Sequence, residues 1–152
     1  METKYRLLSK EELETLQPEF IQYLASNGID ADKWQQILEQ DTKEMDLHIA
    51  TFSDIVMQKS LEKVKYIEHR TATDLKLFYF DQEEAFLIAL KSKTIDLEHL
   101  ERLSPEQLDQ IDLFKANKKY TSTRETEIFD LLNKGCVISE GALYYQLKKL
   151  VG

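Results

Sequence analysis

The stretch EKVKYIEHRTATDLKLFYFDQEEAFLIALKS, residues 62–92, concentrates aromatic and β-branched side chains between two mainly helical flanks. It predicts three short strands, at Val64–Arg70, Asp74–Phe80 and Ala85–Lys91. The polar residues 81–84 have the length of a hairpin loop, and residues 71–73 are also short enough to return the chain antiparallel. We therefore expect a three-stranded antiparallel meander.

Apolar side chains occupy both odd and even positions of the second and third predicted strands, so both faces of the sheet need cover. Three strands cannot bury two apolar faces alone, and helices have to supply the remainder. The predicted fold class is α+β, a central meander packed by N-terminal and C-terminal helices. We expect one domain over residues 1–152, made of a helical part (1–61), the meander (62–92) and a second helical part (93–152).

The composition indicates a folded domain. Hydrophobic residues make up 42% of the 152 positions and charged residues 32%, with four glycines and two prolines. No apolar run approaches the roughly 18 residues of a membrane span, and the N-terminus has no apolar signal segment. The single Cys136 excludes an internal disulfide and a cysteine zinc site. We expect a cytoplasmic protein without membrane contact.

The net charge of −8 is unevenly distributed. Residues 1–103 hold 21 acidic and 13 basic residues, whereas residues 104–152 hold seven of each. An acidic surface repels nucleic acids, so this asymmetry disfavours a polyanionic partner for the first two thirds of the chain. The acidic side chains are expected to form solvated helix faces that keep the protein soluble.

Capping signals divide the N-terminal part into helices. Ser9 followed by Glu12 is a capping box, which predicts a helix directly after Ser9. Pro18 predicts either the start of a second helical segment or a kink in one continuous helix. The pair at residues 27–28, Asn-Gly, predicts the end of that segment.

Two further helices are predicted before the meander. Asp30 is an N-cap signal for a short helix, and a longer helix opens near Asp41. In the longer helix, apolar side chains recur at spacings of four, three and four residues and share one face. They are Met45, Ile49, Phe52 and Val56. We expect this stripe to pack against the sheet.

The C-terminal part carries mixed signals. Residues Thr94–Leu103 favour a short helix, with a strand followed by a turn as the alternative. Ser104-Pro105 predicts a helix start. Lys115–Arg124 is expected to be a basic loop, after which Ser122 or Thr123 caps the next helix.

Four segments resemble a known family. They read YRLLSKEEL at 5–13, FIQYLASNGIDA at 20–31, EHR at 68–70 and DL at 74–75. Together they are similar to a family of small uncharacterised bacterial proteins, a domain of unknown function. The resemblance spans the chain and brings no activity, so it assigns no catalytic or binding role to any residue. It implies a bacterial, single-domain, cytosolic protein.

The predicted final helix carries the one functional motif. Residues Gly141–Leu150, GALYYQLKKL, look like the recognition helix of winged-helix repressors, and a preceding helix around Ile128–Leu132 adds to the likeness. A helix-turn-helix requires a positioning helix between these elements, but only residues 136–138 separate Gly135 from Ser139. The motif is incomplete, and DNA binding is disfavoured.

Catalytic patterns are weak. Glycine-rich phosphate loops and the Gly-x-Ser-x-Gly, His-Glu-x-x-His and Cys-x-x-Cys motifs do not occur. His69 beside Arg70 and Asp74 is the best candidate for acid–base chemistry, but an Arg70–Asp74 pair and a His69 hydrogen bond that fasten a turn are favoured. Cys136 precedes two β-branched residues, which favours a buried, unreactive thiol. No enzyme activity, cofactor or metal is expected.

We therefore expect a non-catalytic binding or adaptor module that contacts another macromolecule, with a protein as the favoured partner. The alternative is a nucleic-acid-associated regulator that uses the C-terminal helix and the Lys115–Arg124 loop. Aromatic and basic side chains often anchor binding surfaces. The candidate interaction residues are Tyr120, Tyr144, Tyr145, Lys118, Lys119 and Lys148. The sequence leaves the oligomeric state undetermined.

Overall fold

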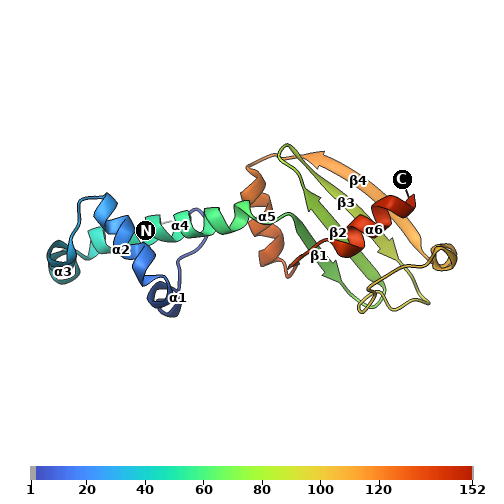
Figure 1. The fold of residues 1–152 in the computed structure, drawn as a ribbon, viewed down its shortest axis with the longest axis horizontal. Coiled ribbons are helices and arrows are strands. Elements are labelled where there is room, and N and C mark those ends of the chain that lie inside the picture. Colours follow the sequence, from blue (N-terminus) through green and yellow to red (C-terminus); the bar gives the residue numbers. More distant parts are fainter. Residues whose placement is uncertain (1–2, 152) are drawn as a thin grey trace. The chain divides into compact units, whose positions relative to one another are not determined.

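The computed structural model describes residues 3–151. The chain forms two compact units, Met1–Ser60 and Leu61–Gly152, of which the first is helical and the second combines a sheet with helices (Figure 1). The predicted α+β class is confirmed, whereas the single domain over residues 1–152 stays a prediction. None of the helices between residues 3 and 151 combines the length and the apolar character that a membrane span requires.

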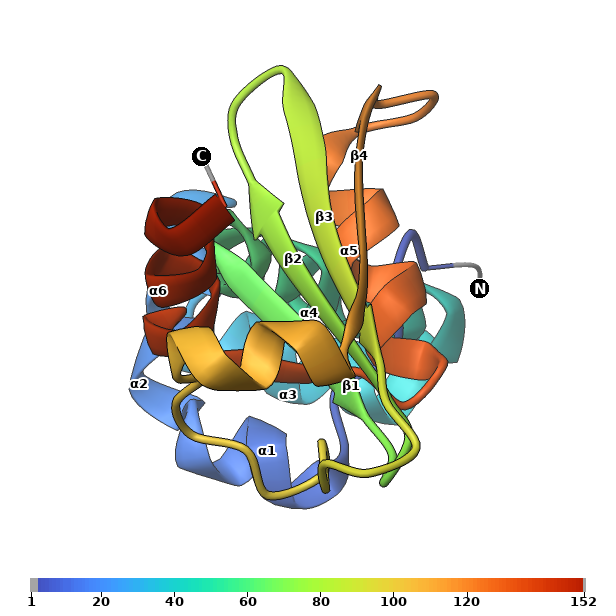
Figure 2. The same ribbon diagram turned by 90° about the vertical axis from the view of Figure 1, so that its right-hand side faces the viewer.

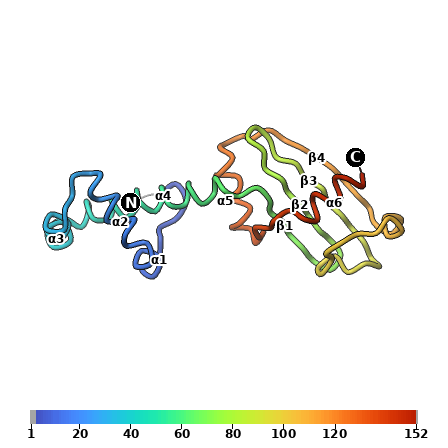
Figure 3. The backbone as a smooth tube through the Cα atoms, in the orientation of Figure 1, coloured from blue at the N-terminus to red at the C-terminus, as the bar shows by residue number. Residues whose placement is uncertain are grey.

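Four helices begin in the N-terminal unit: α1 Lys10–Thr15, α2 Gln17–Ser26, α3 Ala31–Gln40 and α4 Thr42–Glu62 (Figure 3). The capping box is confirmed, because Ser9 and Glu12 each accept a hydrogen bond from the other's backbone N–H. Pro18 stands in the first turn of α2, so it starts a second helix. Gly28 follows α2 with a φ of +75°, and Asp30 caps α3 as predicted.

The core of this unit is aromatic. The ring centroid of Phe52, on α4, lies 5.0 Å from that of Phe20 and 5.6 Å from that of Tyr23, both on α2. Met45 packs against the buried cluster of α2 and α3. The prediction that this stripe of α4 packs against the sheet is therefore wrong for Phe52 and Met45. Helical periodicity identifies which face is buried, but it does not identify what covers that face.

Five antiparallel strands form one sheet in the C-terminal unit, in the order β4-β3-β2-β1-β5. They are β1 Tyr66–Arg70, β2 Asp74–Phe80, β3 Glu84–Lys91, β4 Asp112–Lys119 and β5 Val137–Ser139. The predicted meander is confirmed as β1 to β3, but the sheet has five strands instead of three. β4 is largely exposed and β5 has three residues, so neither shows the apolar run of a central strand.

One face of the sheet carries the main core of this unit. Leucine and isoleucine side chains of β2 and β3 pack there against α6 (Ala142–Val151), which contributes Leu143, Tyr144 and Leu147. Figure 2 shows α6 and the short 3-10 helix η1 (Pro105–Gln110) on one side of the sheet and α5 (Arg124–Asn133) on the other. The two faces are therefore covered by different helices.

The segment between β3 and η1 differs from the prediction. Residues Thr94–Leu103 form neither a helix nor a strand. Three buried leucines, Leu97, Leu100 and Leu103, anchor them in the core, and Arg70 donates hydrogen bonds to the carbonyls of Leu97 and Leu100. These side-chain bonds satisfy backbone groups that a helix would otherwise pair. The start at Ser104-Pro105 is confirmed, although it opens the 3-10 helix η1.

Candidate functional site

An apolar row crosses the face of the sheet that α5 covers only in part. The antiparallel register aligns Ile138, Ile67, Phe78, Leu87 and Ala116 across the five strands. Ile138 is 58% exposed, and Phe114, two residues from Ala116 on β4, is 61% exposed. We call Phe78, Leu87, Phe114, Ala116 and Ile138 the open face. Ile67, between Ile138 and Phe78, is 1% exposed, so the exposed apolar side chains stand at the two edges of the sheet, Phe114 on β4 and Ile138 on β5. Exposed apolar side chains that adjoin a pocket, as on β4, are typical of interaction surfaces.

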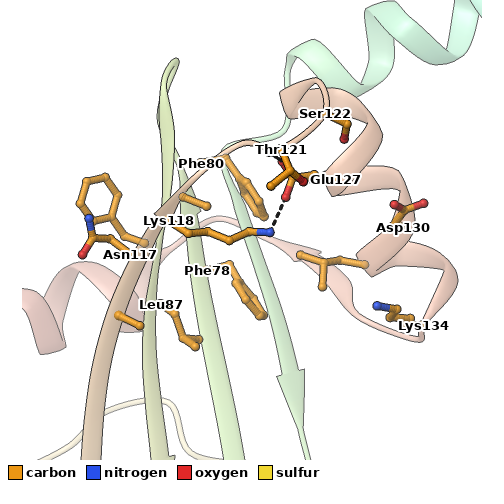
Figure 4. Close-up of a pocket in the computed structure, with 14 residues that line it drawn as sticks. Phe78, Phe80, Leu87, Asn117, Lys118, Thr121, Ser122, Glu127, Asp130 and Lys134 are labelled. Carbon is orange, nitrogen blue, oxygen red and sulfur yellow. Dashed lines mark hydrogen bonds and ion pairs between the residues drawn. The ribbon is translucent and has the colours of Figure 1, made fainter.

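A pocket of about 490 Å³ lies between the open face and α5. Figure 4 shows Phe78, Phe80 and Leu87 pointing into it from the strands, with Glu127 and Asp130 of α5, and Lys134 directly after that helix, opposite. We call this space the α5 pocket. Its apolar floor and few polar rim groups match the general character of ligand-binding pockets, and its size is within their range.

The rim of the α5 pocket carries an ion pair. Lys118 of β4 contacts Glu127 of α5 at 2.6 Å, and the other carboxylate oxygen of Glu127 accepts a hydrogen bond from the backbone N–H of Thr121 at 3.0 Å. The side chain of Lys118 is 63% exposed, so the pair contributes little to stability. Lys118 therefore stands at the mouth of the pocket with its ammonium group held by Glu127.

A second pocket, of about 280 Å³, lies beside α6. Its lining includes Phe86, Lys115 and Asn117 from the strands and Tyr144 and Lys148 from α6. We call it the α6 pocket. Both pockets reach β4 at residues 116–117. The same strand therefore borders a hollow on each face of the sheet.

β4 is an edge strand, because among residues 3–151 it pairs with β3 alone. The outer backbone groups of an edge strand have no partner in the sheet. Its side chains alternate between the faces, so Phe114, Ala116 and Lys118 lie on the α5 side and Lys115 and Lys119 on the α6 side. The α5 side of β4 thus presents Phe114 and Ala116 between the charged Asp112 and Lys118, and the α6 side presents Lys115 and Lys119 with Leu113 and Asn117.

The predicted lysines gather along this edge. Lys118 stands at the α5 pocket and Lys148 at the α6 pocket, and Lys119 is the cross-strand neighbour of Glu84. Together β4 and α6 contain five lysines and one acidic residue, Asp112. A local basic surface therefore exists on a chain whose net charge is −8.

The three predicted tyrosines have different environments. The hydroxyl of Tyr120 donates to the backbone carbonyls of Asp81 at 2.6 Å and Glu84 at 3.1 Å, and burial raises its pKa to about 12. Tyr144 is 6% exposed within the core. Tyr145 is 58% exposed, and the ammonium of Lys149 lies 4.4 Å from its ring centroid. Of these three, Tyr145 is the one that presents a surface ring.

The prediction of a basic loop at Lys115–Arg124 is wrong. Residues 115–119 belong to β4, and Arg124 is the first residue of α5. Arg124 is 9% exposed and is hydrogen-bonded to backbone carbonyls, so it is not a surface cation. β5 lies between α5 and α6, in place of the positioning helix that a helix-turn-helix requires. Leu143 and Leu147 hold α6 in the core.

The contacts of His69, Arg70 and Asp74, at the turn between β1 and β2, also differ from the prediction. Arg70 pairs with Glu68 at 2.8 Å, and Asp74 contacts Lys91 at 3.9 Å, so the expected Arg70–Asp74 pair is wrong. His69 lies opposite Lys76 on the other face of the sheet from Arg70, because neighbours along a strand point to opposite sides. Burial raises the pKa of the Cys136 thiol, which favours its unreactive form.

Metal ligands do not gather in the structure. Among the side chains of residues 3–151, no group of three or more His, Cys, Asp and Glu is placed to hold a metal ion. His99 lies 2.7 Å from Asp96, and the hydrogen bond to that carboxylate raises the pKa of His99. Both side chains are exposed, and the pair lies in the irregular segment before η1.

None of the five residues of the open face is among the sequence candidates, including its two exposed members, Phe114 and Ile138. A signal was present for Phe114, since residues 113–117, LFKAN, place Phe114 and Ala116 on one face of a strand and Lys115 on the other. The signal for Ile138 was weaker, because β5 has three residues. Only the register with β1 aligns Ile138 with the apolar row.

The chain was compared with protein families, curated proteins and solved structures. A model described as "Family of unknown function (DUF6495)" matches residues 1–152. No curated protein and no solved structure matches the chain.

Proposed function

We propose that this chain, which belongs to the DUF6495 family of unknown function over residues 1–152, is a non-catalytic binding module that contacts another protein. The binding surface in this proposal is the open face together with the edge strand β4. The observation that carries it is the apolar row at the α5 pocket, in which half-buried Phe78, Leu87 and Ala116 lead to Phe114, which is 61% exposed. Such a row is costly to leave in water, and a partner removes that cost.

The chemistry of this surface supports a protein partner. Phe114 and Ile138 offer apolar area without a polar group, and such side chains contribute to affinity when a partner excludes water from them. A nucleic acid is bound mainly through phosphate contacts, which need a basic field. The chain as a whole carries a net charge of −8, so its long-range field opposes a polyanion.

The polar groups of the α5 pocket support binding rather than catalysis. One carboxylate oxygen of Glu127 contacts Lys118, and the other accepts from the N–H of Thr121. A general base must instead reach a proton of the substrate. We infer that Glu127 holds the loop between β4 and α5 and positions the Lys118 side chain at the rim.

Site-specific photo-crosslinking in the native cell tests the proposal. A photoreactive amino acid replaces Phe114, and in a matched control it replaces Ile21, which is 57% exposed in the N-terminal unit. We expect a discrete protein adduct from position 114, identified by mass spectrometry and absent from position 21. Equal yields from positions 114 and 21 would overturn the proposal.

The second candidate is a nucleic-acid-associated regulator. The observation in its favour is the set of five lysines on β4 and α6, with the exposed ring of Tyr145 close to Lys149. Fluorescence anisotropy with random duplex DNA and with single-stranded RNA, at low and physiological salt, distinguishes the two functions. Submicromolar binding at physiological salt that Lys118→Glu or Lys148→Glu weakens would replace the protein-binding proposal with this one.

The proposal includes a cytoplasmic location in a bacterium. The single Cys136 supports it, because one cysteine offers no internal disulfide of the kind that is common in oxidising compartments. Cell fractionation with an antibody against the chain tests this part, and recovery in the periplasmic or culture fraction would refute it.

A further inference from the structure

We infer that the partner binds as an extended segment that adds a strand to the outer edge of β4, with acidic residues alternating with apolar ones. This inference rests on the proposed function and names the chemistry of the partner segment. The apolar residues of the segment face the α5 side of the sheet, and its acidic residues face the α6 side.

The backbone of β4 supplies the first part of the argument. β4 spans eight residues and pairs with β3 alone among the strands of residues 3–151. Its outer N–H and C=O groups are therefore available to another strand, and strand addition to a sheet edge satisfies both backbones at once. Eight residues exceed the length of an average strand, so the edge offers a complete ladder.

The two pockets supply the second part. Successive side chains of an added strand point to opposite faces of the sheet. The α5 pocket and the α6 pocket lie on opposite faces and meet at residues 116–117 of β4. A segment paired with this part of β4 would place neighbouring side chains in different pockets, which is how peptide binding at a sheet edge acquires sequence preference.

The charges assign a chemistry to each face. On the α6 side, Lys115 of β4 and Lys148 of α6 both line the α6 pocket, Lys119 lies on the same face of β4 opposite Glu84, and α6 contains no acidic residue. On the α5 side, Phe114 and Ala116 are apolar, and Lys118 already contacts Glu127. Opposite charges across neighbouring strands attract and apolar pairs pack. Acidic side chains therefore complement the α6 side, and apolar side chains complement the α5 side.

Lysines also occur on edge strands as protection against aggregation. That role accounts for Lys115 and Lys119, but it does not account for Phe114, which is 61% exposed on the same edge. A second copy of β4 is a poor occupant, because a β4–β4 pair would bring the lysines of one copy against those of the other. A segment of another protein with alternating acidic and apolar residues would cover Phe114 and would not bring lysines against lysines.

Peptide titration of the full-length chain tests the inference. The probe is a short, fluorescein-labelled peptide of alternating glutamate and valine, and binding is followed by anisotropy and by amide chemical shifts. We expect perturbed amides in β4 and roughly tenfold weaker binding of a control peptide with the same residues in two blocks. N-methylation of alternate peptide nitrogens, which removes backbone donors, should weaken binding by a similar factor.

Variants of the chain complete the test. Lys115→Glu with Lys119→Glu is expected to weaken binding of the alternating peptide about tenfold or more, and Phe114→Ser should weaken it without unfolding the chain, since Phe114 is exposed. Lys33→Glu, at an exposed position of α3, is the matched charge control and should leave binding unchanged.

The outcomes separate the two proposals. If position 114 crosslinks a protein but the alternating and block peptides bind equally, or N-methylation has no effect, strand addition is wrong and the protein-binding function stands. If no protein is crosslinked at position 114 and single-stranded RNA displaces the peptide from β4, both proposals are overturned in favour of nucleic-acid binding.

Discussion

At the residue scale, one buried guanidinium ties the start of α5 to the sheet. Arg124 is the first residue of α5 and donates hydrogen bonds to three backbone carbonyls, those of Leu61, Val64 and Phe80. Hydrogen bonds from a charged donor are stronger than neutral ones. They hold the start of α5 at the end of β2, while Phe114 at the β4 edge stays exposed.

Gly141 gives a prediction at the same scale. Both Gly141 and Gly135 adopt positive φ, of +82° and +100°, so alanine at either position is strained by about 1–2 kcal/mol. A Cβ at Gly141 would also lie 2.5 Å from ring atoms of Tyr66, whereas nothing lies within 4 Å of one at Gly135. We expect Gly141→Ala to lower the free energy of unfolding by roughly 1–3 kcal/mol more than Gly135→Ala does.

Urea denaturation of both variants, followed by circular dichroism, measures this difference. Gly135→Ala is the matched control, because it carries the backbone strain without the overlap. Equal losses in the two variants would mean that the Tyr66 ring moves aside at no cost.

At the element scale, β4 combines the features on which both proposals depend. It is an edge, it places Phe114 and Lys115 on opposite faces, and it borders a pocket on each face. A central strand with two neighbours would have no outer backbone groups to offer. The position of β4 in the sheet, and not its composition alone, therefore makes it a candidate binding element.

The cap of α1 yields a pH-dependent prediction. Arg6 donates to both carboxylate oxygens of Glu12, at 2.8 and 3.0 Å, and this hydrogen bond is the main cause that lowers the pKa of Glu12 to about 2. Because the pKa is lower in the folded chain, the stabilisation is present above the ordinary carboxyl pKa of about 4.3 and is lost as the pH falls toward 2.

Arg6→Gln should therefore raise the pKa of Glu12 toward its ordinary value and reduce the stability that is lost on acidification. A carbon-detected NMR titration of the Glu12 carboxyl group measures the change. Concentrated salt should also raise the pKa of Glu12, because the Arg6–Glu12 pair is exposed and dissolved ions screen it. Lys10→Gln is the control and should leave the titration unchanged; an equal shift in both variants would contradict the assignment to Arg6.

α4 yields the third prediction. Phe52 is 3% exposed and contacts the rings of Phe20 and Tyr23, whereas Ile55 on the same helix is 39% exposed. Phe52→Ala should lower the free energy of unfolding by roughly 3–5 kcal/mol, and Ile55→Ala by less than about 1 kcal/mol. Chemical denaturation measures both. A loss for Phe52→Ala no larger than that for Ile55→Ala would exclude Phe52 from the core.

At the scale of the whole molecule, the net charge is negative, whereas β4 and α6 are locally basic. The chain carries a net charge of −8, while β4 and α6 contain five lysines and one acidic residue, and Phe114 on the other face of β4 from Lys115 is exposed. A net charge of this size generally opposes association between copies of a chain. The local lysines then select for acidic partners at short range, where the ions of the solution screen the more distant charges.

Local signals in the sequence determined most of the helix starts and the central meander. The strand Asp74–Phe80 has the predicted bounds, and Ser9, Asp30 and Thr123 cap helices as predicted. These features depend on residues within a few positions of one another, such as a cap and the N–H groups that follow it. Gly28 is of the same kind, because its positive φ is a local requirement.

Tertiary structure alone decided the edges of the sheet and therefore the candidate site. From the sequence, most of β4 is predicted to be a basic loop and β5 a short connection. In the structure, β4 pairs with β3 and β5 pairs with β1. Half-exposed strands need few apolar residues, because backbone partners that are distant in the sequence hold them. The same holds for two adjacent tyrosines, since packing against the sheet buries Tyr144 and leaves Tyr145 exposed. Which apolar side chains remain uncovered depends on where each helix packs, and that is a property of the folded chain.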